Sequence, residues 1–211
     1  MTTTFPQSPA PQRGSLVAID QTTSQQTVIG FQYNPETLTR KLTPQMVTGS
    51  HDRNEALRLK GPPQETISLV IEIDAADQLD KGDSNTSSLG IHPMLAALEL
   101  LVYPKSSTII DNEKMASQGI IEVLPLEAPL TLFVWGKKRT LPVHLNSFSI
   151  TEESFDPELN PINAKVSLDM LVLTYLDLDF NSQGGSLFMK YHQNKESLAM
   201  KNAQNAATIN L

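Results

Sequence analysis

The side chains able to perform chemistry are few in this chain and far apart. None of the four histidines lies four residues from another, and no HExxH motif is present. They are His51, His92, His144 and His192. A lone histidine on a strand or loop is usually structural or solvated. The spacing therefore predicts no metal site and no histidine-based catalytic set.

Acidic residues form the densest polar pattern. Asp74, Asp77, Asp80 and Asp83 recur every third residue, but the central glycine and distal glutamate of a calcium-binding EF-hand loop are missing. The pattern favours a mobile acidic loop over residues 74–89. Two further aspartates, at 177 and 179, alternate with apolar residues, which is typical of the solvated face of a strand.

Motifs for nucleophilic catalysis or phosphate binding are absent from the sequence. No serine lies in G-x-S-x-G or S-x-x-K, and the glycines form no phosphate-binding loop. The chain has no cysteine, which excludes disulfides, thiolate catalysis and cysteine-ligated metals. Trp135 is able to stack on a sugar or base, but at the end of an apolar strand it favours a packing anchor. We therefore expect no enzymatic activity and no cofactor.

Composition and charge narrow the class of protein. With 211 residues and 39% hydrophobic content, the chain is large enough for one domain with a core. Its net charge of −7 disfavours nucleic-acid binding. The N-terminus lacks the features of a signal peptide, and no apolar run approaches the length of a bilayer span. We expect cytoplasmic synthesis and no membrane insertion.

Three units are predicted to position these residues: a flexible arm over 1–14, a β domain over 15–182 with a helix near 92–103, and a helical tail over 183–211. In the N-terminal half, alternation and turn residues predict a hairpin (15–20 and 27–33), an edge strand (38–46) and a half-buried strand (67–73). Pro93 is placed to open the helix.

The C-terminal half is more regular. Residues 130–135 read as a strand, 136–139 as a turn and 143–150 as a second strand. Within that second strand the apolar phase shifts by one residue, which predicts a β-bulge near 146–147. A wide turn over 155–161 and a further alternating strand from 166 follow.

Five segments, in this order, resemble a known family. FQYNPETL (31–38) resembles F-x-[FY]-N-P-x-x-[LI], and ETISLVIEI (65–73) resembles the strand that follows a Gly-Pro step. PLTLFVWG (129–136), LNSFSIT (145–151) and FDPELNPINAKVSL (155–168) resemble the later motifs. Together they are similar to the tube and baseplate-hub proteins of contractile injection systems, which are phage-tail-like machines.

The resemblance covers about residues 15–175 and carries several expectations. It implies a mainly β fold with one or two helices, an antiparallel barrel or sandwich of the tail-tube type that forms a ring, in most cases a hexamer. It implies a structural role for seven motif residues: Asn34, Pro35, Phe133, Trp135, Gly136, Phe155 and Pro161. The implied partners are a spike protein, the inner-tube protein and other baseplate subunits, in a particle that is either released or attached to a membrane.

Two departures from the family pattern matter. Leu159-Asn160 replaces the usual turn glycine, and Asn160 is expected to supply the left-handed conformation. Many members also carry a C-terminal LysM module, and about thirty residues after Phe180 are too few for one, so glycan binding is not inferred.

Three functions remain open at this point. The first is a baseplate ring that joins the spike to the inner tube and initiates tube assembly. The second is the major inner-tube protein itself, although such proteins are usually shorter and lack long tails. The third is a small β-barrel that binds a ligand or sugar through Trp135 and the acidic loop.

Overall fold

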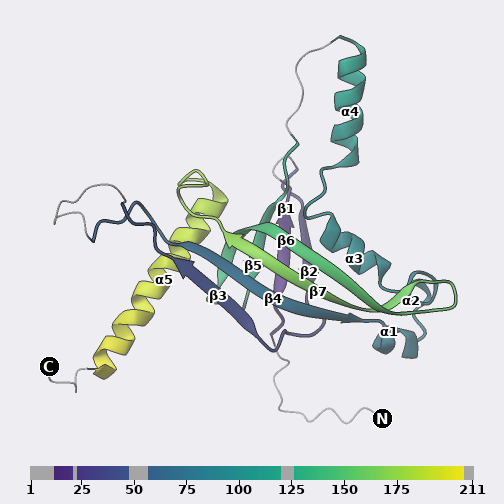
Figure 1. Cartoon of the computed structure of the whole chain (residues 1–211), viewed down its shortest axis with the longest axis horizontal. Coiled ribbons are helices and arrows are strands. Elements are labelled where there is room, and N and C mark those ends of the chain that lie inside the picture. The colour runs from purple at the N-terminus through teal and green to yellow at the C-terminus, as the bar shows by residue number, and fades with distance from the viewer. Residues whose placement is uncertain (1–11, 21–22, 48–56, 120–125, 207–211) are drawn as a thin grey trace.

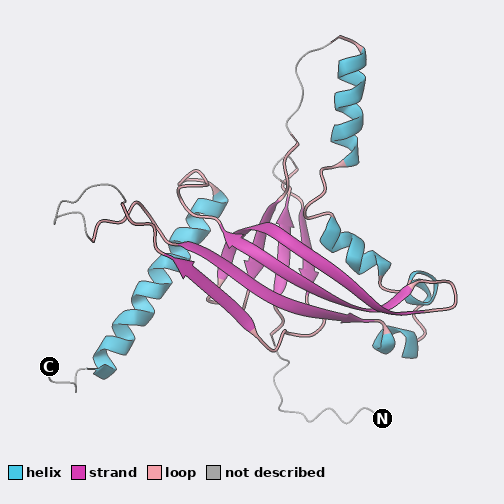
Figure 2. Ribbon diagram, in the orientation of Figure 1, coloured by secondary structure: helices cyan, strands magenta, loops and turns pink. Residues whose placement is uncertain are grey.

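The computed structural model describes residues 12–20, 23–47, 57–119 and 126–206. Within these residues it contains seven strands and five helices (Figures 1 and 2). The strands are β1 (Ser15–Ile19), β2 (Gln26–Gly30), β3 (Leu38–Thr43), β4 (Gln64–Asp74), β5 (Leu130–Val134), β6 (Thr140–Phe155) and β7 (Pro161–Val172). The helices are α1 (Ala76–Asp80), α2 (Ser84–Leu89), α3 (His92–Glu99), α4 (Ser106–Ser117) and α5 (Gln183–Ala206).

All seven strands belong to one sheet in the order β2-β1-β5-β6-β7-β4-β3, and each neighbouring pair is antiparallel. The prediction of a mainly β, antiparallel fold is confirmed. Two details differ from expectation. The described chain has five helices rather than one or two, and the sheet ends in β2 and β3 without closing into a barrel.

The centre of the sheet follows directly from sequence alternation. In β4, and in β7 from Ala164 onward, every second side chain is buried, and the register places Leu69 opposite Leu168 and Ile71 opposite Val166. Because side chains alternate between the two faces of a strand, each strand presents one apolar face to the core. Branched residues such as Ile and Val are suited to this pleated, half-buried surface.

The long strand β6 connects two halves of the sheet. Its first residues pair with β5, and it then pairs with β7 as far as Phe155. The register shifts between Leu145 and Ser147, which confirms the predicted bulge. The sheet coils along this strand, so that β1, β2 and β5 cross behind β4 and β7 (Figure 1). Side chains of both halves therefore enter one hydrophobic core.

A side chain joins the two halves where no strand pairing does. Gln32 follows β2, and its side-chain nitrogen Nε2 donates to the Asp74 backbone carbonyl at 2.7 Å. The Asp74 amide donates back to Gln32 Oε1 at 2.9 Å. This reciprocal pair reproduces the hydrogen bonding of one residue in a β-ladder. It ties the end of β2 to the end of β4.

The predicted acidic loop over 74–89 is wrong, because this segment contains α1 and α2. Asp83 is the N-cap of α2: its carboxylate accepts from the Thr86 hydroxyl at 2.6 Å and from the Thr86 amide at 3.4 Å. The Thr86 hydroxyl, followed by the backbone bonds, holds the pKa of Asp83 below its ordinary value of 3.8. The helix predicted at Pro93 is confirmed as α3, which buries Leu95 and Leu98.

The next two helices extend away from the sheet. α4 stands out from the body, and α5 crosses one end of the sheet and projects beyond it (Figure 1). The strand predicted around Asp177 and Asp179 is wrong, because β7 ends at Val172 and a turn follows. In that turn the Asp177 carboxylate accepts from the Thr174 amide and hydroxyl at 2.9 and 2.8 Å. The apolar run GIIEVL (119–124) also predicts a strand, and residues 120–124 of it lie outside the described residues.

Candidate assembly interface

Five of the seven motif residues lie around the segment that enters β1. Asn34 holds this segment with both ends of its amide: Oδ1 accepts from the Gly14 amide at 2.8 Å, and Nδ2 donates to the Gln12 carbonyl at 2.9 Å. The Gly14 carbonyl accepts from the Phe31 amide at 2.8 Å. The side chain of Asn34 thus fixes the start of the sheet, and Pro35 follows it directly in the chain.

Trp135 covers the same segment from the other side. A Cβ built on Gly14 would lie 2.7 Å from two Trp135 ring carbons and 2.8 Å from Phe31, so a side chain larger than hydrogen does not fit there. The Trp135 ring also stacks on the fully buried Phe133, with ring centroids 5.9 Å apart. Gly136, at φ +69°, then turns the chain from β5 into β6.

The other two motif residues, Phe155 and Pro161, lie together at the turn between β6 and β7, where they are register partners. Pro161 is buried, and its carbonyl accepts from the Ile91 amide at 2.9 Å. Phe155 is half exposed. The motifs therefore fix two separate corners of the fold rather than one common site.

The turn itself corrects one expectation. Leu159, not Asn160, adopts the left-handed conformation, with φ +65°. The Asp156 carboxylate fastens the turn by accepting from the Asn160 amide and side chain, both at 2.8 Å. The Asn160 side chain, followed by that backbone bond, holds the pKa of Asp156 below its ordinary value of 3.8. Asn160 serves as a hydrogen-bond donor here, and Leu159 carries the backbone strain.

Two strand edges are available for contacts between molecules. In the described chain β2 pairs with β1 alone and β3 with β4 alone, so each has one edge without a strand partner. Free edges of this kind are templates for pairing with another chain. β3 carries Arg40 and Lys41, and Val28 on β2 is largely exposed.

α4 is poorly packed against the rest of the described chain. None of its twelve residues is buried, and Ile109 and Ile110 are both exposed. At its base, Leu100, Val102 and Tyr103 are also exposed. A helix of this length is only marginally stable in water without packing. The element is therefore suited to stabilisation by a neighbour.

α5 is attached to the sheet through a buried carboxylate. Glu65 on β4 is 3% exposed and accepts from Arg40 Nε at 2.7 Å and from Lys195 Nζ at 3.1 Å. Arg40 also donates to the Tyr191 hydroxyl at 3.0 Å, and Lys195 lies 4.1 Å from the centre of the Tyr191 ring. Phe188 and Tyr191 supply the buried apolar contact of the helix.

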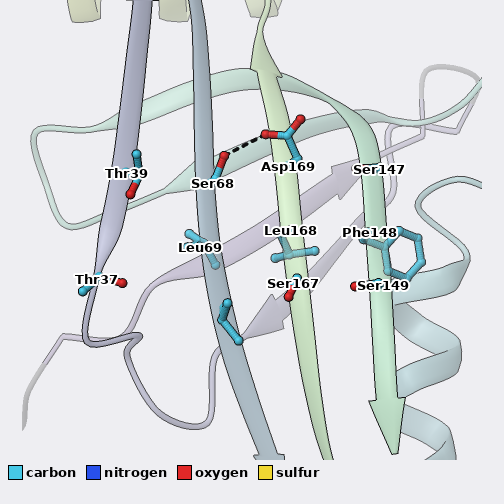
Figure 3. Close-up of a pocket in the computed structure, with 11 residues that line it drawn as sticks. Thr37, Thr39, Ser68, Leu69, Ser147, Phe148, Ser149, Ser167, Leu168 and Asp169 are labelled. Atoms are coloured by element: carbon cyan, nitrogen blue, oxygen red, sulfur yellow. Dashed lines mark hydrogen bonds between the residues drawn. The ribbon is translucent and has the colours of Figure 1, made fainter.

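The solvent-facing side of β3, β4, β7 and β6 carries a shallow hollow of about 470 Å³ (Figure 3). Its polar lining is hydroxyl-rich, and the Ser68 hydroxyl donates to the Asp169 carboxylate at 2.8 Å. The hydroxyl groups come from Thr37, Thr39, Ser68, Ser147, Ser149 and Ser167. Among the described residues no group of three or more His, Asp or Glu side chains is arranged to hold a metal ion.

Sequence reasoning missed the Glu65 cluster and the extended α4. A charged residue inside an alternating strand reads as solvent-facing, and Glu65 is in the buried phase of β4. The position of Glu65 in the same phase as the apolar residues of β4 is the sequence signal that could have identified it as buried. α4 gave a weak signal because its apolar residues form no continuous stripe. None of the described helices combines the length and apolar character needed to cross a lipid bilayer.

Comparison with known proteins gives little. No protein-family model and no curated protein matches the chain. Among solved structures, a chain of the virion of a native gene transfer agent particle is similar at 12% identity, covering 75% of this chain and 90% of that one, with a TM-score of 0.28. Similarity at this TM-score is too low to support an argument about fold or function.

Proposed function

We propose that this protein is a non-catalytic structural subunit of a contractile injection system baseplate, which forms a ring, joins the spike to the inner tube and initiates tube assembly. The observation that carries the proposal is the pair of free edges, β2 and β3, at the two ends of one open sheet. Pairing of such edges between copies would generate a closed ring and remove both edges from solvent. The ordered motifs from residue 31 to 168, which resemble those of the family, support the same proposal.

The projecting elements fit the same function. α4 has no buried side chain, and the second half of α5 extends past the sheet (Figure 2). In a stacked assembly these helices would contact the spike on one side and the tube on the other. Trp135 is proposed as a packing anchor, since Phe133 and Gly14 both pack against its ring.

Electron microscopy of the full chain tests this proposal, alone and after co-expression with the spike and inner-tube proteins of the same system. We expect a ring of six copies bound to the spike. A strictly monomeric particle in the presence of the spike contradicts the proposal. Long tubes formed by this chain alone would instead assign it as the major inner-tube protein.

A matched pair of variants tests the role of the strand edges. Val28→Lys places a charge on edge strand β2 at a side chain that is 65% exposed, so the core is unaffected. Lysine on an edge strand opposes edge pairing. Val70→Lys makes the same change on β4, which is paired on both sides, at a side chain that is 45% exposed. We expect the first variant to lose rings and the second to keep them, and equal behaviour contradicts edge pairing.

A further inference from the structure

The net charge of the chain is concentrated at one end of the molecule. We define the acidic end as residues 72–83 and 152–165, which the pairing of β4, β7 and β6 places together. It contains nine Asp and Glu and two Lys, a surplus of seven negative charges. The whole chain has 23 acidic and 16 basic residues, a net charge of −7, so the remaining residues sum to zero.

The opposite end has the opposite sign. We define the basic end as residues 38–47, 57–65 and 183–202, which comprise β3, the start of β4 and α5. It contains seven Lys and Arg and two Glu, a surplus of five positive charges. Counting Asp177 and Asp179 from the loop before α5 still leaves a surplus of three. The two ends lie at opposite extremes of the long axis, where α1 and α2 stand at one side and α5 at the other (Figure 1).

Each charged end also exposes large apolar side chains. At the acidic end these are Phe155 and Leu159, with Leu89 nearby on α2. At the basic end Leu57 and Leu59 precede β4, and Leu198 and Met200 lie on the projecting part of α5. An apolar centre with a charged rim is the usual composition of a protein–protein interface. The two ends therefore carry opposite charge, and both expose apolar side chains.

Leu159 gives an independent reason to regard the acidic end as a binding surface. Its side chain is 77% exposed although its backbone has φ +65°, a conformation that costs a branched apolar residue energy. Hydrogen bonds from Asn160 to Asp156 and to the Ser88 carbonyl hold the turn in place. Backbone strain of this kind concentrates at functional positions of proteins, and here it holds an apolar side chain in solvent.

We infer that the acidic end of one copy docks on the basic end of a second copy, head to tail, with Leu159 at the centre of the contact. A second copy is the occupant because both complementary surfaces belong to this chain. Such a contact is heterologous and builds either a closed ring or an open stack. The inference requires no spike or tube protein, so it goes beyond the function proposed above and can fail separately from it.

Charge reversal tests the head-to-tail geometry. One variant carries Asp77→Lys, Asp80→Lys, Glu152→Lys and Glu158→Lys, which changes the acidic end from −7 to +1. A second carries Lys41→Glu, Lys60→Glu, Lys190→Glu and Lys201→Glu, which changes the basic end from +5 to −3. Sedimentation of the purified full chain should show self-association that weakens as salt rises, because salt screens exposed charges. Each variant should associate about 10-fold more weakly or worse. An equimolar mixture should recover association, since alternating copies make every contact complementary.

Two controls keep the test decisive. Glu36→Lys, Asp111→Lys, Glu113→Lys and Glu127→Lys together change the charge by as much as the acidic-end variant but outside both ends, and should leave association unchanged. Leu159→Gly should weaken association without lowering the stability of the monomer, which separates a contact role from a folding role. The inference is overturned by a wild-type chain that stays monomeric, by association that is insensitive to the reversals, or by a mixture that fails to recover it.

Discussion

Lys195 on α5 and Glu65 on β4 are 130 positions apart in the chain, yet Lys195 Nζ donates to Glu65 Oε2 at 3.1 Å. The Glu65 side chain is 4% exposed, whereas those of Arg40 and Lys195 are 26% and 36% exposed. The carboxylate is thus the buried member of the cluster and the two cations reach it from the surface. This arrangement attaches a projecting helix to the sheet by charge as well as by apolar contact.

Replacing Glu65 by glutamine should destabilise the protein by about 2–3 kcal/mol, because two cations lose their buried acceptor charge. Urea unfolding measures the loss, and circular dichroism should show release of α5 before the sheet unfolds. The exposed Glu196→Gln on the same helix is the control, with an expected change below about 0.5 kcal/mol. Equal effects of the two variants would show that Glu65 does not anchor the helix.

Gly14→Ala should destabilise the fold by about 1–3 kcal/mol, because the new methyl group overlaps Trp135 and Phe31. Thermal unfolding measures the change, and emission from the single tryptophan should shift as its packing changes. Gly30→Ala is the matched control: nothing lies within 4 Å of a Cβ built there, so its stability should be preserved. Similar losses at both positions would argue against the Trp135 contact.

Leu159→Gly should stabilise the isolated chain by about 0.5–1 kcal/mol, since glycine adopts the left-handed conformation without steric cost. The gain from relieved strain is partly offset by the greater freedom of glycine in the unfolded chain. Denaturant unfolding provides the measurement. Leu57→Gly, at a position that is 90% exposed and has no positive φ, should give no gain.

The turn carboxylate should contribute to acid sensitivity. The pKa of Asp156 in the folded chain is below its ordinary value of 3.8, so the unfolded chain takes up the proton first as the pH falls. The stabilisation from Asp156 is therefore complete above that ordinary value and is lost as the pH falls through the folded pKa. Asp156→Asn should flatten the stability profile below pH about 4. A profile identical to that of the wild type would contradict this.

α4 should be an early site of proteolysis in the free protein. Lys114 lies in a helix with no buried side chain, whereas Lys165 lies in the central strand β7. Segments with little burial open at low free-energy cost, so brief trypsin digestion should cleave at Lys114 well before Lys165. Mass spectrometry of the fragments identifies the sites. Protection of Lys114 after co-expression with the spike would locate α4 in the assembled interface.

Regular strands were predictable from the sequence because alternation reports burial directly. The buried faces of β4 and β7 and the bulge in β6 required no information beyond the order of apolar residues. α1 and α2 escaped prediction because they are stabilised by caps and contacts rather than by an apolar stripe. Asp83 caps α2, and a Cβ on Gly90 would lie 2.3 Å from the Pro161 carbonyl oxygen, a contact 71 positions along the chain.

The candidate interface was less predictable than the fold. Asn34 and Trp135 were identified as motif residues, but their shared contact with Gly14 depends on β1 lying between β2 and β5. The left-handed residue was assigned to Asn160 on propensity, and the hydrogen bonds of Asp156 and Asn160 override that preference in favour of Leu159. The repeat of aspartates from Asp74 to Asp83 shows part of the acidic end in the sequence, but the separation of charge between two ends arises from the register of strands far apart in the chain.

The strand order has a consequence for synthesis of the chain on the ribosome. β1 leaves the ribosome early but pairs with β5, and β4 pairs with β7, which begins at Pro161. At about 5–20 residues per second, roughly 5–20 s pass between the synthesis of apolar Ile67 and Leu69 and the synthesis of their partners in β7. During that interval the nascent chain exposes half-formed hairpins that are prone to aggregate. Chaperone supply and translation rate, rather than the stability of the finished fold, are therefore expected to set its yield in the cell.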